Sequence, residues 1–166
     1  IVQELGSVNA LLKNESGFTL KVAVNEGFSD GLLIGASISV NGCCLTVTEF
    51  DQNFISFDVI KETIRVTNLE YLELADKVNL ERSLKYGDEV GGHILSGHVS
   101  CGAEAILKKQ EGETELVMKC PDKWRKYILL KGYVAVNGAS LTVAKVSQGS
   151  FSVFLIPETL ASTNLS

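Results

Sequence analysis

The sequence lacks the features of several protein classes. It contains 2 prolines among 166 residues and no apolar run approaching the roughly 20 residues that a membrane-spanning helix needs. The opening residues, Ile1-Val2-Gln3-Glu4, have neither the basic nor the apolar segment of a secretory signal. The chain has a net charge of −5 and no cluster of Lys or Arg, so nucleic-acid binding through phosphate neutralisation is not expected. We therefore expect a cytoplasmic globular protein without a membrane or nucleic-acid partner.

Motifs for metals, dinucleotides and hydrolysis are missing as well. The four cysteines include the adjacent pair Cys43-Cys44 and no paired C-x-x-C spacing, so reduced thiols are expected. His93 and His98 are five positions apart, which would place them on opposite faces of a strand and argues against a joint metal site. The glycine-dense segment 91–99 does not match G-x-G-x-x-G, and there is no G-x-S-x-G or H-E-x-x-H. No metal or cofactor is expected.

The chain contains an internal repeat with an offset of 96 residues. Val40-Asn41-Gly42 returns as Val136-Asn137-Gly138, and 136 − 40 = 96. Over positions 40–69, 14 of 30 residues are identical to their counterparts, where chance would give about two. The sequence therefore predicts two homologous units, 1–90 and 91–166.

Each unit reads as a series of short strands. Segments rich in β-branched and aromatic residues are separated by Gly, Asn or Asp turn signals, as at 22–24, 37–40, 45–48 and 54–57. Helical patterns are few, the best being 122–130 and its counterpart 30–34. The first unit continues into a strand at 76–81 that has no counterpart before Ser166, so the second barrel is expected to be incomplete in this chain. The predicted fold is all-β, with two small antiparallel barrels in tandem.

A polar strand face recurs in both units. Alternation places Cys44 and Thr46 opposite the apolar Leu45 face, and it places Ser140 and Thr142 opposite Leu141. The pairs Glu62-Thr63 and Glu158-Thr159 also recur. Exposed strand faces and helix caps would explain each feature singly, but together they could line a pocket for a hydrogen-bonding heterocycle.

Two further residues have both a functional and an ordinary interpretation. His98 could act as a general acid or base, since imidazole titrates near neutrality, or it could be a structural histidine. Lys131 precedes the matching strand of the second unit, where a surface lysine is the ordinary interpretation.

Several motifs resemble the riboflavin synthase family when taken in order. They are Asn41-Gly42-Cys43-Cys44-Leu45-Thr46-Val47-Thr48, Lys61-Glu62-Thr63, Thr67-Asn68-Leu69, Gly91-Gly92-His93, Ser96-Gly97-His98 and Lys131-Gly132-Tyr133. The resemblance implies two six-stranded Greek-key barrels, a C-terminal helix, and trimers that bind substrate between barrels of neighbouring chains. It also implies a transferase that needs no cofactor and converts two 6,7-dimethyl-8-ribityllumazine molecules into riboflavin and 5-amino-6-(ribitylamino)pyrimidinedione.

The resemblance also implies two sets of substrate-binding residues. The first barrel would contribute Ile1, Val2, Cys44, Leu45, Thr46, Asp58, Val59, Ile60, Lys61, Glu62 and Thr63. The second would contribute Gly97, His98, Val99, Lys131, Ser140, Leu141, Thr142, Ile156, Pro157, Glu158, Thr159, Leu160 and Ala161. Within these sets, His98 is the candidate for proton transfer, and Cys44 or Ser140 would lie near the activated ring.

The chain departs from the family pattern at both ends. The family usually has Met-Phe-x-Gly ahead of the Ile-Val that opens this sequence, and a further strand and helix after the point where it stops. Activity and trimer formation are therefore expected of the full-length protein. A binding protein that holds a lumazine or flavin without turning it over is the chief alternative, and a purely structural barrel module is a third.

Overall fold

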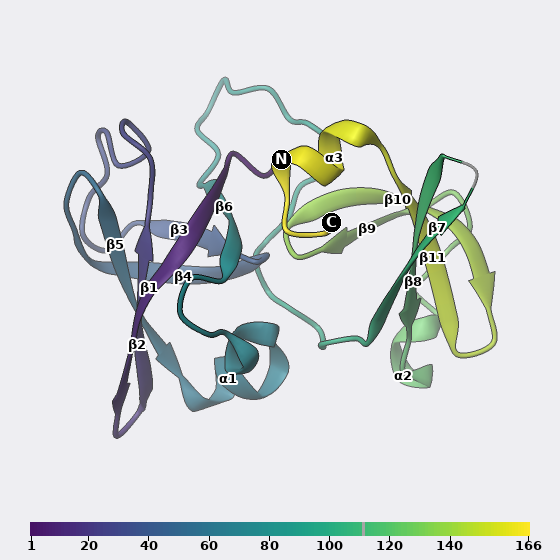
Figure 1. The fold of residues 1–166 in the computed structure, drawn as a ribbon, viewed down its shortest axis with the longest axis horizontal. Helices are drawn as coiled ribbons and strands as arrows, with labels where there is room; N and C mark the ends of the chain where they lie inside the picture. Colours follow the sequence, from purple (N-terminus) through teal and green to yellow (C-terminus); the bar gives the residue numbers. More distant parts are fainter. Residues whose placement is uncertain (111) are drawn as a thin grey trace.

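The computed structural model describes residues 1–110 and 112–166, which form two β units side by side (Figure 1). The first unit is a closed antiparallel barrel with strand order β1-β2-β5-β4-β3-β6. Its strands are β1 (Glu4–Asn14), β2 (Gly17–Ala23), β3 (Ser37–Val40), β4 (Cys43–Phe50), β5 (Phe54–Ile60) and β6 (Lys77–Arg82). The predicted strands at 22–24, 37–40, 45–48, 54–57 and 76–81 all correspond to strands of this barrel.

The second unit repeats this arrangement within the described residues as a five-stranded sheet with order β7-β8-β11-β10-β9. Its strands are β7 (Ala105–Gln110), β8 (Glu113–Lys119), β9 (Tyr133–Val136), β10 (Ala139–Ser147) and β11 (Ser150–Leu155). The prediction of an all-β fold with tandem barrels, the second incomplete in this chain, is confirmed. The domain boundary between residues 90 and 91 stays a prediction.

Matching two-residue turns begin the central strand of each unit. Val40 pairs with Cys43, and Asn41 and Gly42 between them have φ of 49° and 79°. In the second unit Val136 pairs with Ala139, across Asn137 and Gly138 with φ of 47° and 83°. Positive φ at both central positions is the geometry of a type I′ hairpin, for which Asn-Gly is the preferred sequence.

Each unit has its own apolar core, and each core also includes one valine from the leading segment of the other unit. The first core is built around fully buried side chains such as Phe57 and Leu20, and the second around residues such as Val153 and Met118. Val2 lies near the start of the first unit but packs in the second core, with 9% of its surface exposed. Val99 lies near the start of the second unit and packs against the first core. The two units are therefore tied together by their own leading segments.

The helices are short, and two helical predictions need correction. Of the predicted helix 122–130, α2 covers Asp122–Arg125; two i→i+3 hydrogen bonds then carry the chain to Ile128. Segment 30–34 is not a helix but part of a series of turns, because Gly31 adopts a φ of 63°. The other helical elements are α1 (Lys61–Val66), the 3₁₀ turn η1 (Asn68–Tyr71) and α3 (Pro157–Ser162). Among the described residues, no helix combines the length and the apolar character needed to cross a membrane.

Candidate active site

The polar face predicted for the first unit lies on the outside of its barrel. Along β4, Cys43, Leu45 and Val47 are buried, whereas Cys44 and Thr46 are exposed. Ser39 pairs with Cys44 across the β3–β4 ladder, which extends the row of hydroxyl and thiol groups onto the next strand. The alternation predicted from the sequence is confirmed at this strand.

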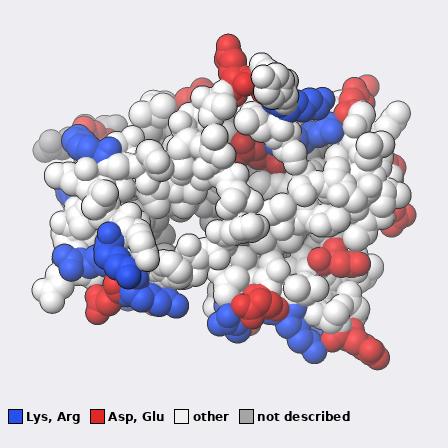
Figure 2. All heavy atoms as spheres, turned by 180° about the vertical axis from the view of Figure 1, so that it is seen from behind, with Lys and Arg blue, Asp and Glu red and all other residues white. Residues whose placement is uncertain are grey.

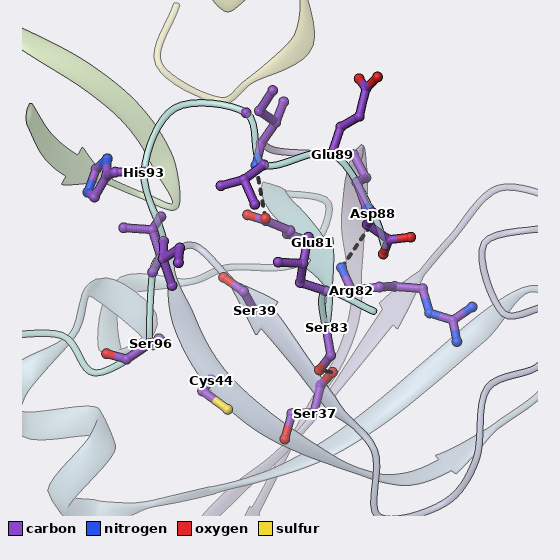
Figure 3. A pocket seen from close by; sticks show the side chains of 18 residues that line it. Ser37, Ser39, Cys44, Glu81, Arg82, Ser83, Asp88, Glu89, His93 and Ser96 are labelled. Atoms are coloured by element: carbon purple, nitrogen blue, oxygen red, sulfur yellow. Dashed lines mark hydrogen bonds and ion pairs between the residues drawn. The ribbon is translucent and has the colours of Figure 1, made fainter. Parts of the chain in front are cut away.

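A cavity of about 430 Å³ adjoins this face (Figure 3). One wall is formed by Ser37, Ser39 and Cys44, and the opposite wall by the linker around residues 88–97. Ile1 also lines the cavity. A volume of this size is within the range of small-molecule sites, so the cavity can hold a bicyclic heterocycle.

The two thiols at the start of β4 differ in their environment. Burial, and secondarily the neighbouring Cys44, raises the pKa of Cys43 to about 11, so this thiol stays protonated at neutral pH. Cys44 is exposed on the polar face, and all four cysteines are free. Of the adjacent pair, Cys44 is therefore the thiol that a ligand can reach.

The second unit presents the equivalent face on β10. Ala139, Leu141 and Val143 point into the core, and Ser140 and Thr142 point outward. The equivalence follows from the same type I′ turn and the same alternation, because Ser140 and Cys44 both lie three residues after the turn asparagine.

The linker between the units contacts both faces. The carbonyl of Gly97 accepts a hydrogen bond from the Cys44 amide at 2.9 Å. Gly97 has a φ of 76°, and a Cβ there would lie 2.5 Å from Cys44 Cβ, so glycine is required for this approach. Nearer its start, the linker places His93 Nδ1 2.6 Å from Ser140 Oγ. One linker segment thus reaches both polar faces.

His93 is a residue that the sequence analysis did not assign to the site. Its ring stacks on Tyr133 with a centroid separation of 4.3 Å, and burial lowers its pKa. A neutral imidazole can accept the Ser140 hydroxyl proton in a hydrogen bond. The sequence shows Gly92-His93, but the contact of His93 with Ser140 depends on the path of the linker. The linker contains no strand, so no alternation of side chains in the sequence indicates which way His93 points.

The remaining predicted residues fall into distinct groups. Leu45, Val59, Leu141 and Val2 are buried in the cores, so their side chains face away from the outer surface. Asp58 is exposed on β5 and accepts a hydrogen bond from Thr19 Oγ1 at 2.7 Å. The exposed isoleucines Ile60 and Ile156 end the strand segments beside the two faces and precede α1 and α3.

The two short helices carry the recurring Glu-Thr pairs. Glu62 is exposed and bonds Arg65 at 2.6 Å, and this bond lowers the pKa of the carboxyl. Glu158 lies in the first turn of α3. The carbonyls of Thr63 and Thr159 accept bonds from threonine hydroxyls four residues later, which close each helix. The other residues predicted here are Lys61 in α1 and Pro157, Leu160 and Ala161 in α3.

His98 and Lys131 lie at the edges of the two faces. His98 follows Gly97 directly, is exposed, and donates its backbone N–H to Ser96 Oγ at 3.3 Å. Lys131 has a φ of 63°, and its amide donates to the Val143 carbonyl, which holds the turn before β9 against β10. His93, rather than His98, contacts Ser140 directly.

Comparison with known proteins places this arrangement among flavin-related proteins. A family model described as the lumazine binding domain matches residues 1–83 and again 96–166. Riboflavin synthase of Escherichia coli K12 is 44% identical over 167 aligned residues, covering 99% of this chain and 78% of that protein. Riboflavin synthase of Chlamydia pneumoniae is 42% identical, covering 99% of this chain and 81% of that protein.

Solved structures give the same picture for the fold. The crystal structure of LumP complexed with riboflavin is 26% identical with a TM-score of 0.90, covering 99% of this chain and 90% of that one. The complex of LumP with 6,7-dimethyl-8-(1'-D-ribityl) lumazine has a TM-score of 0.88 at 25% identity, covering 99% of this chain and 89% of that one.

Proposed function

Because this chain belongs to the riboflavin synthase family and matches the lumazine binding domain twice, we propose that its two polar faces are the half-sites of that enzyme. The activity is that of a transferase in the last step of riboflavin biosynthesis. A four-carbon unit passes from one 6,7-dimethyl-8-ribityllumazine to another, and the products are riboflavin and 5-amino-6-(ribitylamino)pyrimidinedione. Two like substrates then meet two related surfaces.

The observation that carries this proposal is the equivalence of the two faces. Cys44 and Ser140 occupy the same position after the same turn, and Thr46 and Thr142 follow on the same side of each strand. Hydroxyl and thiol groups on one side of a strand suit a heterocycle with polar edges.

The proposed roles follow the geometry of the linker. His98, which follows the Gly97 that bonds the Cys44 amide, transfers the proton of the acidic methyl group of one lumazine, and Cys44 or Ser140 lies near the ring of the other. His93 holds the Ser140 hydroxyl through their 2.6 Å contact. The substrate-binding residues proposed are the two sets given by the resemblance.

The assembly proposed for the full-length protein is a cytoplasmic homotrimer with substrate between barrels of neighbouring chains. Exposed apolar side chains support a further interface. Leu33 and Ile34 are 72% and 71% exposed, and their counterparts Leu129 and Leu130 are 66% and 61% exposed. Figure 2 shows mixed charges separated by broad uncharged areas on the face opposite to that of Figure 1.

A non-catalytic lumazine- or flavin-binding protein is the second candidate, because similar solved structures include LumP complexes. Mixing the full-length protein with 6,7-dimethyl-8-ribityllumazine and following riboflavin absorbance separates the two. Steady accumulation of riboflavin is expected. Tight binding of the lumazine with no riboflavin formed would favour the binding protein instead.

A further inference from the structure

Four asparagine side chains form a closed ring of hydrogen bonds where the two units meet. Asn41 Nδ2 donates to Asn68 Oδ1 at 3.5 Å, and Asn68 Nδ2 donates to Asn137 Oδ1 at 3.1 Å. Asn137 Nδ2 donates to Asn164 Oδ1 at 3.3 Å, and Asn164 Nδ2 returns to Asn41 Oδ1 at 3.0 Å. Each amide donates once and accepts once within the ring. Removal of Asn68 or Asn137 therefore leaves both a donor and an acceptor without their partners at a part-buried site.

The ring follows the internal repeat. Asn137 and Asn164 lie 96 positions after Asn41 and Asn68, so opposite corners are equivalent residues. The bonds that cross between units are 3.1 and 3.0 Å long, and those within a unit are 3.5 and 3.3 Å long. The ring therefore has approximate twofold symmetry, with one half contributed by each copy of the repeat.

The turns beside the ring are in direct contact. A Cβ placed on Gly42 would lie 2.6 Å from the Gly138 amide nitrogen, so the two Asn-Gly turns meet backbone to backbone. From β6, Asn79 adds a bond from its Nδ2 to the Asn137 carbonyl at 2.8 Å and accepts one from the Asn164 amide at 2.8 Å. The ring therefore joins turns, a strand and the segments that follow α1 and α3.

Turn geometry accounts for only part of this arrangement. The positive φ of Asn41 and Asn137 suits a type I′ turn, and glycine can also adopt this conformation. Asn68 and Asn164 do not lie in such turns, yet their amides complete the ring. The repeated Thr-Asn-Leu motif therefore has a role beyond that of a local cap.

We propose that the four-asparagine ring is a positioning device that fixes the angle between the two barrels and thereby the spacing of the half-sites. Strands β4 and β10 leave the turns at Asn41 and Asn137, and Cys44 and Ser140 lie three residues farther on. In a closed assembly, the spacing between half-sites of neighbouring chains depends on the angle between barrels in each chain. This proposal rests on the proposed function.

Asn137→Gly in the full-length protein tests the ring while preserving the turn. The kcat for riboflavin formation should fall about fivefold or more, as expected for loss of a part-buried hydrogen-bond partner, with little change in KM. Asn9→Asp, at an exposed asparagine outside the ring, should leave kcat unchanged. An unchanged kcat in a folded Asn137→Gly variant would overturn the proposal.

A double-mutant cycle on Asn68 and Asn164 tests whether the ring acts as a unit. Neither side chain bonds the other, so independent roles would give additive losses. We expect Asn68→Ala, Asn164→Ala and the double variant to have similar kcat values, because the first break opens the ring. A loss of kcat in the double variant equal to the product of the two single-variant losses would contradict a ring that acts as a unit.

If the alanine variants do not fold, Asn68→Asp provides the test, because aspartate has nearly the same shape as asparagine. The ionised carboxyl cannot donate to Asn137 Oδ1, whereas the protonated carboxyl can. Its kcat relative to the unmodified protein should therefore recover as pH falls, and a ratio independent of pH would refute the proposal. If the unmodified full-length protein makes no riboflavin, the proposed function fails, whatever the ring variants do.

Discussion

At the scale of single residues, His93 and Ser140 form a pair that predicts a pH dependence. Burial lowers the pKa of His93, so near neutral pH the imidazole is neutral and can accept a hydrogen bond from Ser140. Protonation removes this acceptor, and kcat should fall as pH drops through the lowered pKa. The free energy of unfolding should change in the same direction. The unfolded chain binds the proton more readily than the folded chain does, so the stability that His93 contributes declines as the pH falls below its unfolded-state pKa of about 6.5.

His93→Gln should lower kcat about tenfold and flatten the acid limb of the pH profile that belongs to this residue. Steady-state rates of His93→Gln, Ser140→Ala and the double variant provide the check. Because the two side chains bond each other, the double variant should be no slower than Ser140→Ala alone. Fully additive losses would show that His93 does not act through Ser140.

The adjacent cysteines should differ sharply in reactivity. Cys43 is buried with a pKa of about 11, whereas Cys44 is exposed. Iodoacetamide at pH 8 should alkylate Cys44 and leave Cys43 unmodified, as read by peptide mass spectrometry, because the thiolate is the reactive form. Riboflavin should slow labelling of Cys44 if that thiol lies in the binding site. Equal labelling of the two cysteines would contradict the burial of Cys43.

At the scale of elements, the linker depends on glycine where it meets β4. Gly97→Ala forces a Cβ to within 2.5 Å of Cys44 Cβ at a φ of 76°, and it should cost about 1–3 kcal/mol of unfolding free energy. Gly149→Ala is the matched control, because Gly149 has the same φ of 76° and a Cβ there meets nothing within 4 Å. Urea denaturation compares the two variants. Equal stability would mean that the linker does not lie against Cys44.

How much of each element could be predicted depended on its periodicity. Strand β4 was predicted together with its polar face, because Cys44 and Thr46 alternate with core residues. The 11-residue β1 was not, because a bulge between Val8 and Ala10 interrupts its register with β2. Apolar spacing at 122–130 suggested a helix, but the local chain continues as 3₁₀-type turns after Arg125. The His93 contact came from tertiary structure alone.

At the scale of the whole molecule, the repeated apolar pairs predict an interface. Leu130 is 61% exposed, and its counterpart Ile34 is also exposed and apolar. Leu130→Ser should weaken assembly of the full-length protein in sedimentation velocity without lowering the unfolding midpoint, because this side chain is mostly in solvent within the chain. Leu12→Ser, also at 61% exposure but with Lys108 as its counterpart, should leave assembly unchanged. Identical sedimentation of both variants would show that Leu130 does not lie in the interface.

The exchange of Val2 and Val99 between the cores has a consequence for the order in which the protein is made. All six strands of the first barrel leave the ribosome before Val99, so that barrel reaches its full complement of core side chains only after the linker has emerged. Val2, by contrast, is synthesised first, but the core that buries it forms only after the second unit has been synthesised. Although domains generally fold as units during synthesis, we expect neither copy to reach its final stability before the other has been translated.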